Sequence, residues 1–295
     1  MDKPPSFQSK LIYKIIGMLN MGGKMERKIL ENTFPKKAAK IPKSFYGKYE
    51  VQTVPQNDRN IWEIARKSND SDLVILYLHG GAYYANMNTL HWRLIEQLVL
   101  KTNAKVIVPD YPLSPESVCV EVYQFMDELY KRLINRYPDK RTAFMGDSAG
   151  GGIALGFAQK IKNEEVKQPV EIILFSPWLD VSMSNPDLIK FEKDDKMLNV
   201  KALKMAGKNY AGSLEVSDYR VSPINGNFND LTRVTIFTGT KDVLITDARR
   251  CKQLCDEEGI PFNYFEYRDM FHDWVIIPGL KESQDVMDKV REILK

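Results

Sequence analysis

Short, continuously apolar runs alternate with longer segments of helical periodicity over most of the chain. A continuous apolar run such as 73–78 is typical of a strand buried on both faces of a parallel sheet. Similar short runs predict further strands at 106–108, 142–145, 172–175, 234–237 and 262–267. Apolar residues three and four apart predict helices between them, at 88–101, 116–136, 149–162, 246–257 and 281–294. This alternation predicts an α/β protein with a mainly parallel sheet covered by helices on both faces.

Two segments depart from the alternation and predict a small helical cap. Residues 182–220 are rich in Lys, Asp, Asn and Ser, with a helix-like stretch near 200–209, and they follow the strand at 172–175. An insertion at that point lies on the side of the sheet where ligands bind. We therefore expect 1–45 and 182–220 to form the cap, and 46–181 with 221–295 to form the catalytic domain. A long surface excursion without function is the alternative for 182–220.

The N-terminal segment has an amphipathic pattern. Lys14 interrupts its apolar stretch, which is far shorter than the roughly 20 residues of a membrane span. We expect a helix packed on the body of the protein or over a pocket, and no stable membrane insertion. Its apolar positions at helical spacing are Ile12, Ile15, Ile16 and Leu19.

Composition narrows the functional classes. The 295 residues are 43% hydrophobic and 27% charged with a net charge of +3, which gives no reason to expect a nucleic-acid partner. The three cysteines are too few for a disulfide framework and favour packing roles in a reducing compartment, so we expect a cytoplasmic protein.

The segment Gly146-Asp147-Ser148-Ala149-Gly150 matches the pattern G-x-S-x-G. A predicted strand ends just before it and a predicted helix begins within it, as expected for a nucleophile elbow. Small neighbours give the sharp turn the room that it needs. The pattern predicts Ser148 as a nucleophile, whereas a serine-capped glycine turn is the alternative.

A serine nucleophile needs a base, and the chain has only three histidines. His79 follows a predicted strand, and His91 lies within a predicted helix, where a packed or solvated histidine is expected. In folds with a nucleophile elbow, the catalytic residues follow one another along the chain in the order Ser, acid, His. Only His272 lies after Ser148, so it is the predicted base. We expect it in the loop 269–274.

The acid should lie between Ser148 and His272, at the carboxyl end of a strand. Asp242 follows the strand at 234–237, and Asp180 follows the strand at 172–175. Asp269 is close to His272 in sequence but comes from a different element. We favour Asp242, which would hold the imidazole in the correct tautomer, and Asp180 remains the alternative.

Backbone N–H groups that could stabilise an oxyanion are expected after the strand at 73–78. Glycines there let the backbone approach a substrate carbonyl closely enough to donate hydrogen bonds. An ordinary glycine turn is the alternative. The candidate donors are Gly80, Gly81, Ala82 and, after the nucleophile, Ala149.

Taken in order, these motifs resemble the hormone-sensitive-lipase-like esterases over residues of about 70 to 275. The matching segments are His79-Gly80-Gly81-Ala82, 110–116, Gly146-Asp147-Ser148-Ala149-Gly150-Gly151, Ser176-Pro177-Trp178-Leu179-Asp180 and Gly239-Thr240-Lys241-Asp242. The resemblance implies a capped α/β-hydrolase fold, hydrolysis of short-chain acyl esters without a cofactor, and oxyanion donors at Gly81, Ala82 and Ala149. The chain departs from the family pattern at Ala82, where a third glycine is usual, and at Pro112 and Ser114, where Arg and Ala are usual.

We therefore predict a serine carboxylesterase with an acyl-enzyme intermediate on Ser148. A small-molecule ester is the expected partner, and a homodimer is compatible with the sequence. Two alternatives remain, a small-molecule binding protein of the same fold and an amide or peptide hydrolase. Aromatic side chains that could line the substrate pocket, or merely pack in the core, are Tyr83, Tyr84, Trp178 and Trp274.

Overall fold

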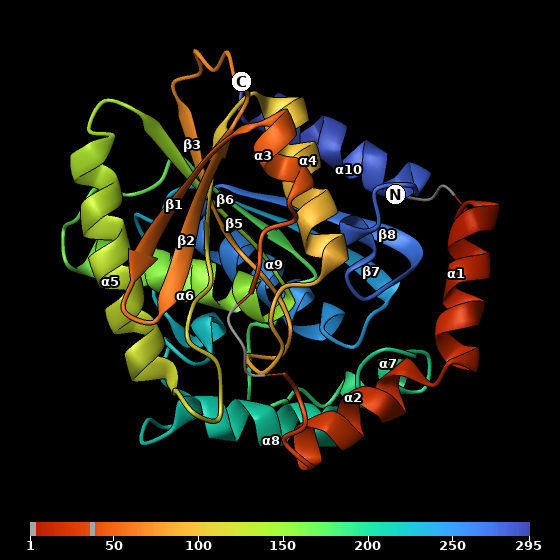
Figure 1. Ribbon diagram of the computed structural model, residues 1–295. Coiled ribbons are helices and arrows are strands. Elements are labelled where there is room, and N and C mark those ends of the chain that lie inside the picture. The colour runs from red at the N-terminus through yellow and green to blue at the C-terminus, as the bar shows by residue number, and fades with distance from the viewer. Residues whose placement is uncertain (1–3, 36–38) are drawn as a thin grey trace.

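The computed structural model describes residues 4–35 and 39–295 (Figure 1). The strands of these residues form one eight-stranded sheet in the order β1-β2-β4-β3-β5-β6-β7-β8. All neighbouring strands from β4 to β8 pair in parallel, and only β2 is antiparallel to its neighbours β1 and β4. The strands are β1 (Glu50–Gln56), β2 (Arg59–Ala65), β3 (Leu73–Leu78), β4 (Lys105–Pro109), β5 (Arg141–Asp147), β6 (Glu171–Phe175), β7 (Val234–Lys241) and β8 (Phe262–Phe271).

Helices cover both faces of this sheet, as predicted. On one face α4 (Thr89–Thr102), α10 (Lys281–Ile293) and the short α3 (Ser44–Lys48) bury their apolar side chains in a common cluster with the sheet. On the other face α5 (Cys119–Arg136), α6 (Ser148–Asn163) and α9 (Ile245–Glu258) do the same. Alternate residues of β3, such as Ile75 and Leu76, belong to the two different clusters. The continuous apolar run at 73–78 therefore reflects burial on both faces.

The apolar pattern predicted no strand before residue 73, and the structure adds β1 and β2 there. β1 is mostly exposed or half-buried and contains Pro55, so it lacks the apolar run of a central strand. It pairs with β2 through a tight turn at Asn57, whose φ is 54°. β8 also continues through Asp269 to Phe271, so the predicted loop 269–274 begins inside a strand.

The helices of the two predicted cap segments lie mainly at one end of the sheet (Figure 1). There α2 (Met21–Leu30) packs on α8 (Val200–Ala211), with α7 (Leu188–Glu192) nearby. α1 (Phe7–Met18) is tied to α10 by hydrogen bonds from Ser6 and Ser9 to Glu282. α3 packs instead on β1 and α4, although the predicted cap segment 1–45 includes its first residues. The division into cap and catalytic domain stays a prediction.

The helices within the described ranges are all too short or too polar to cross a membrane.

Candidate active site

The turn between β5 and α6 places Ser148 in a strained backbone conformation. β5 ends at Asp147, α6 begins at Ser148, and the φ of Ser148 is 49°. A Cβ on Gly146 would lie 2.4 Å from the carbonyl oxygen of Gly150, and one on Gly150 would lie 2.1 Å from the carbonyl oxygen of Leu78. Both positions therefore require glycine, and the turn has the tight geometry expected of a nucleophile elbow.

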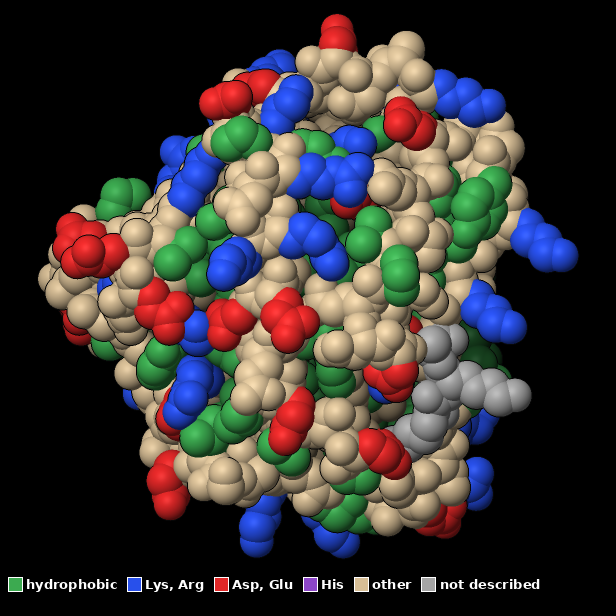
Figure 2. Space-filling view, turned by 60° about the vertical axis from the view of Figure 1, so that its left-hand side comes forward, with side chains coloured by type: hydrophobic (Ala, Val, Ile, Leu, Met, Phe, Trp, Pro, Cys, Tyr) green, Lys and Arg blue, Asp and Glu red, His purple; other side chains and the backbone are tan. Residues whose placement is uncertain are grey.

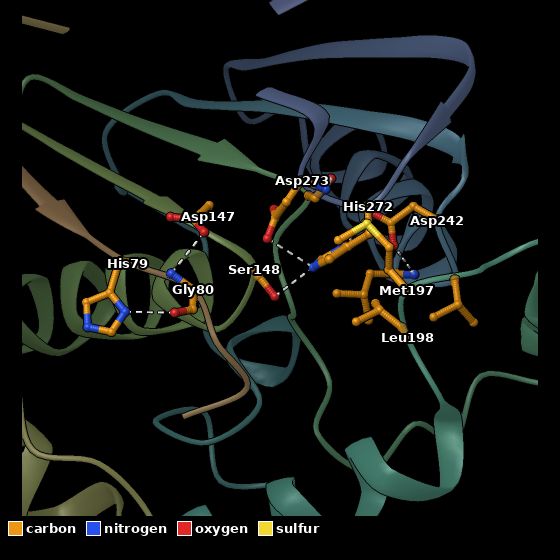
Figure 3. Close-up of polar contacts among 12 residues, drawn as sticks. His79, Gly80, Asp147, Ser148, Met197, Leu198, Asp242, His272 and Asp273 are labelled. Carbon is orange, nitrogen blue, oxygen red and sulfur yellow. Dashed lines mark hydrogen bonds and ion pairs between the residues drawn. The ribbon is translucent and has the colours of Figure 1, made fainter. Parts of the chain in front are cut away.

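Ser148, His272 and Asp242 lie in one hydrogen-bonded line (Figure 3). The Nε2 atom of His272 is 3.0 Å from the Oγ atom of Ser148, and its Nδ1 atom is 2.9 Å from an oxygen of Asp242. Each side chain follows the carboxyl end of a different parallel strand, β5, β8 and β7. The side chains predicted as nucleophile, base and acid are thus within reach of proton transfer.

The other two acid candidates lie apart from the histidine. Asp180 accepts hydrogen bonds from the N–H and hydroxyl of Ser182, and from the hydroxyls of Ser184 and Ser222. Asp269 forms an ion pair with Lys241 at 3.4 Å. Asp180 therefore holds the chain where β6 leads into the cap segment, and neither carboxylate contacts His272 in the described contacts.

The predicted oxyanion donors after β3 differ in what their N–H groups contact. The N–H of Gly80 donates to an oxygen of Asp147 at 2.9 Å, which removes Gly80 from the set of free donors. Among the described residues, the N–H groups of Gly81 and Ala82 have no such partner. Gly81 has a φ of 127° and Ala82 a φ of 53°, so both lie in a left-handed turn. Together with the N–H of Ala149 at the start of α6, they are the remaining candidates.

Asp147, the variable residue of the G-x-S-x-G pattern, is a buried acceptor that the sequence analysis did not single out. Besides the N–H of Gly80, it accepts the hydroxyl of Tyr77 and contacts the Nε2 atom of His91 at 3.3 Å. Burial favours the neutral acid, but these partners outweigh it and lower the pKa of Asp147. An acidic residue inside an elbow of small residues is the signal that could have pointed to this role.

His79 contacts the same turn and does not contact Ser148, His272 or Asp242 in the described contacts. Its Nδ1 atom contacts the carbonyl oxygen of Gly80 at 2.7 Å, and its ring stacks on Tyr111 with the centroids 4.4 Å apart. In Figure 3 the ring lies on the far side of Gly80 from Ser148. Burial lowers the pKa of His79 to about 4, so the ring is neutral at pH 7.

The four aromatic pocket candidates fall into different surroundings. Tyr83 is sandwiched between Trp178, at 5.3 Å, and Tyr210 of α8, at 3.6 Å between ring centroids. We call the turn after β3 that carries the candidate donors Gly81 and Ala82 the oxyanion turn. The stack joins this turn to α8 of the predicted cap segment. Tyr84 is buried in the same cluster and lies near Asn209 of α8. Trp274 belongs to the cluster on the opposite face of the sheet, so its surroundings are those of a core residue.

Two further carboxylates interact electrostatically with the histidine, and neither was predicted from the sequence. An oxygen of Asp273 is 3.1 Å from the Nε2 atom of His272. Asp195, in the predicted cap segment, accepts the N–H groups of Met197, Leu198 and Val243, and so ties the segment 195–198 to the residue after Asp242. Burial raises the pKa of Asp195 to about 6. The available signal for Asp273 was its place directly after His272 in the sequence, whereas the sequence offered none for Asp195.

The site is enclosed. Only 5% of Ser148 and 4% of His272 are exposed, and side chains of the cap segment, Met197 and Leu198, lie beside the histidine (Figure 3). Figure 2 shows one outer face, on which positive and negative side chains are interspersed and no histidine is visible. Burial opposes a charge on His272, but the carboxylates of Asp273 and Asp242 outweigh it and raise the pKa of the imidazole well above its ordinary value.

No group of three or more potential metal ligands occurs among the residues that the structure describes. The arrangement that is present is a hydroxyl, an imidazole and a carboxylate in series, together with backbone N–H groups in the turn after β3 and at the start of α6. This arrangement suits acyl transfer.

Comparisons with known proteins agree with the geometry. Residues 75–276 match the α/β-hydrolase-fold family. An esterase of Acinetobacter venetianus is 28% identical over 214 residues, covering 72% of this chain and 70% of its own. An acetyl-hydrolase of Streptomyces hygroscopicus is 27% identical over 213 residues, covering 72% and 71%.

Solved structures extend the likeness to the whole fold. A Staphylococcus aureus protein proposed to be an esterase superposes with a TM-score of 0.82 at 26% identity, covering 92% of this chain and 89% of its own. A hormone-sensitive lipase from a metagenome library superposes with a TM-score of 0.83 at 18% identity, covering 99% and 98%. The chain belongs to the α/β-hydrolase family, and it is a carboxylic-ester hydrolase.

Proposed function

We propose that the protein is a serine carboxylesterase that hydrolyses short-chain acyl esters through an acyl-enzyme intermediate on Ser148. The observation that carries the proposal is the continuous line from Ser148 Oγ through the two ring nitrogens of His272 to Asp242, at 3.0 and 2.9 Å. A binding protein of the same fold has no need of this line, which therefore favours the enzyme.

In the acylation step, Ser148 Oγ attacks the ester carbonyl carbon and passes its proton to the Nε2 atom of His272. Asp242 holds the Nδ1–H and stabilises the imidazolium as it forms. The negative charge that develops on the carbonyl oxygen is stabilised by the N–H groups of Gly81, Ala82 and Ala149. His272 then donates the proton to the alcohol oxygen as the ester bond breaks.

Deacylation repeats the same steps with water as the nucleophile. His272 takes a proton from water, the hydroxide oxygen attacks the acyl carbon, and the proton returns to Ser148 Oγ as the acid leaves. In both halves of the cycle His272 accepts the proton of the nucleophile and passes it to the leaving group.

The preference for short acyl chains is supported by the crowding around the nucleophile. The Tyr83–Trp178–Tyr210 stack fills the space beside the oxyanion turn. Met197 and Leu198 lie on the other side, beside His272 (Figure 3). Ala82 also carries a methyl group at a position where glycine would leave more room. The name of the acetyl-hydrolase relative agrees with a small acyl group.

The test is hydrolysis of p-nitrophenyl esters from acetate to palmitate, with Ser148→Ala as the control. We expect kcat/KM to be largest for acetate or butyrate and to fall for longer chains. A maximum at palmitate would contradict the short-chain proposal. Failure of a fluorophosphonate probe to label Ser148 in the folded protein would contradict the acyl-enzyme proposal.

A further inference from the structure

The Nε2 atom of His272 faces two groups at nearly the same distance. Ser148 Oγ is 3.0 Å away, and the nearer carboxylate oxygen of Asp273 is 3.1 Å away (Figure 3). The Nδ1 atom on the other side of the ring already contacts Asp242. The imidazole is therefore flanked by a carboxylate at each nitrogen, whereas the proposed mechanism uses only one of them.

The position of Asp273 is built into the turn between β8 and the 3-10 helix at Trp274–Ile276. Its φ is 53°, a left-handed conformation that turns the side chain back toward the preceding histidine. Its N–H donates to the hydroxyl of Ser176 at 3.3 Å, which fixes the turn against the end of β6. The side chain is 10% exposed. Within the described part of the chain, its second oxygen has no hydrogen-bond partner, so His272 is its principal contact.

We propose that Asp273 is a positioning residue for the catalytic base: its carboxylate stabilises the protonated form of His272, so that the neutral base is available only at higher pH than with Asp242 alone. The proposal rests on the proposed function, because it assigns a role within the same site. Asp273 keeps its own negative charge throughout and accepts no proton in the cycle. The proton still moves from Ser148 Oγ to Nε2 and then to the leaving alcohol.

The charged groups around His272 and Asp273 determine whether Asp273 raises or lowers the pKa of His272. His272 also interacts electrostatically with Asp242 and, more distantly, with Asp195. Asp273 interacts electrostatically with three groups on other elements, which are Asp147 of β5, His91 of α4 and Tyr77 of β3. Burial raises the pKa of Asp273 to about 6, despite the opposing effect of the imidazolium, so this carboxylate is charged at pH 7 and above. The same charge helps to raise the pKa of His272. As pH falls through that raised value, His272 gains a proton and can no longer accept one from Ser148.

The first test measures His272 directly, by titrating the imidazole signals of the full-length protein by NMR. The chain has three histidines, so His79→Gln and His91→Gln variants identify their signals by elimination. We expect Asp273→Asn to lower the pKa of His272 by about 1–3 units, the effect of a charge at this distance. An unchanged pKa of His272 in Asp273→Asn would overturn the proposal.

A matched control and a second variant make the result specific. Asp269→Asn is the same substitution in the same segment, at a residue whose φ is 56° and whose carboxylate pairs with Lys241 instead of His272. It should leave the pKa of His272 unchanged, and an equal shift in this control would also overturn the proposal. Asp273→Gly removes the charge at a left-handed position that glycine adopts without strain, and it should lower the pKa as Asp273→Asn does.

The second test is the pH profile of kcat/KM for p-nitrophenyl acetate. In Asp273→Asn the acid limb should move to lower pH by the shift found in the NMR titration, so activity at pH values below the wild-type limb should rise. A loss of activity by the same factor at every pH, with the limb unmoved, would indicate a merely structural role and overturn the proposal. If the wild type hydrolyses no ester, the proposed function fails, while the NMR titration still decides the role of Asp273.

Discussion

Two buried histidines flank the nucleophile turn, and each contacts an aspartate, yet only one is placed for catalysis. His272 contacts Asp242 through Nδ1 and faces Ser148 through Nε2. His91 contacts Asp147 through Nε2, and its Nδ1 atom accepts the backbone N–H of Asn88 at 3.0 Å. Both nitrogens of His91 thus contact only groups of the frame, whereas the Nε2 atom of His272, although Asp273 is also near it, lies within hydrogen-bond distance of Ser148 Oγ.

The difference shows that a His–Asp contact in a buried site does not by itself identify a catalytic base. What matters is the group at the second ring nitrogen. Asp147 is the residue before Ser148, and it accepts contacts from β3, from α4 and from Gly80. It therefore connects these two elements to the turn after β3. The pair His91–Asp147 holds the backbone around the turn, and we propose that the pair His272–Asp242 carries out the proton transfers there.

The largest effects should follow removal of the nucleophile or of the base. We expect Ser148→Ala and His272→Ala each to lower kcat by roughly 10⁴–10⁶-fold, because the proton transfer and the covalent step are lost together. Initial rates with p-nitrophenyl butyrate measure this loss, and circular dichroism checks that the variants fold. Near-wild-type rates in either folded variant would contradict the assignment.

Asp242→Asn should lower kcat by about 10⁴-fold while the fold persists, because the amide cannot stabilise imidazolium and favours the wrong tautomer. Asp269→Asn, at the acid candidate that contacts Lys241, should have little effect. A large loss in Asp269→Asn with a small one in Asp242→Asn would reverse the assignment of the acid.

Much of this site could be predicted from sequence, because its parts lie at the ends of strongly apolar strands. The order of Ser148, Asp242 and His272 after successive strands of a parallel sheet was sufficient to bring them together at one edge. The short run at 234–237 predicted β7 well enough to place Asp242 after it, although β7 itself continues to Lys241.

The parts that sequence did not predict depend on backbone angles and on contacts between distant segments. Asp273 contacts its neighbour His272 with its own φ positive, a conformation that an aspartate tolerates but does not require. The N–H of Gly80 is used by Asp147, 67 positions later in the chain, so this donor could not be excluded from the glycine pattern alone. β1 was missed because an edge strand with one exposed face lacks a continuous apolar run.

Asp147→Asn should have an intermediate effect on catalysis. Three donors converge on the carboxylate, and an asparagine offers them one oxygen and one NH₂ group, so at least one of the three loses its acceptor. The turn that carries Gly81 and Ala82 should lose its fixed position. We expect kcat to fall by up to about 10²-fold with KM nearly unchanged, because the donors act mainly in the transition state. A rise in KM at constant kcat would indicate that the turn binds the substrate rather than the oxyanion.

The smallest catalytic effect should come from His91→Gln, and this variant is the sharpest check on the comparison of the two histidines. No proton transfer passes through His91, so the change in kcat should stay well under the roughly 10²–10⁴-fold that loss of a general base costs. Its cost should be structural, because Asn88 loses a buried acceptor and Asp147 loses a donor. We expect the free energy of unfolding to fall by about 1–3 kcal/mol, measured by urea denaturation. If His91→Gln instead abolished hydrolysis while its stability stayed at the wild-type value, the two His–Asp pairs would have to exchange their assigned roles.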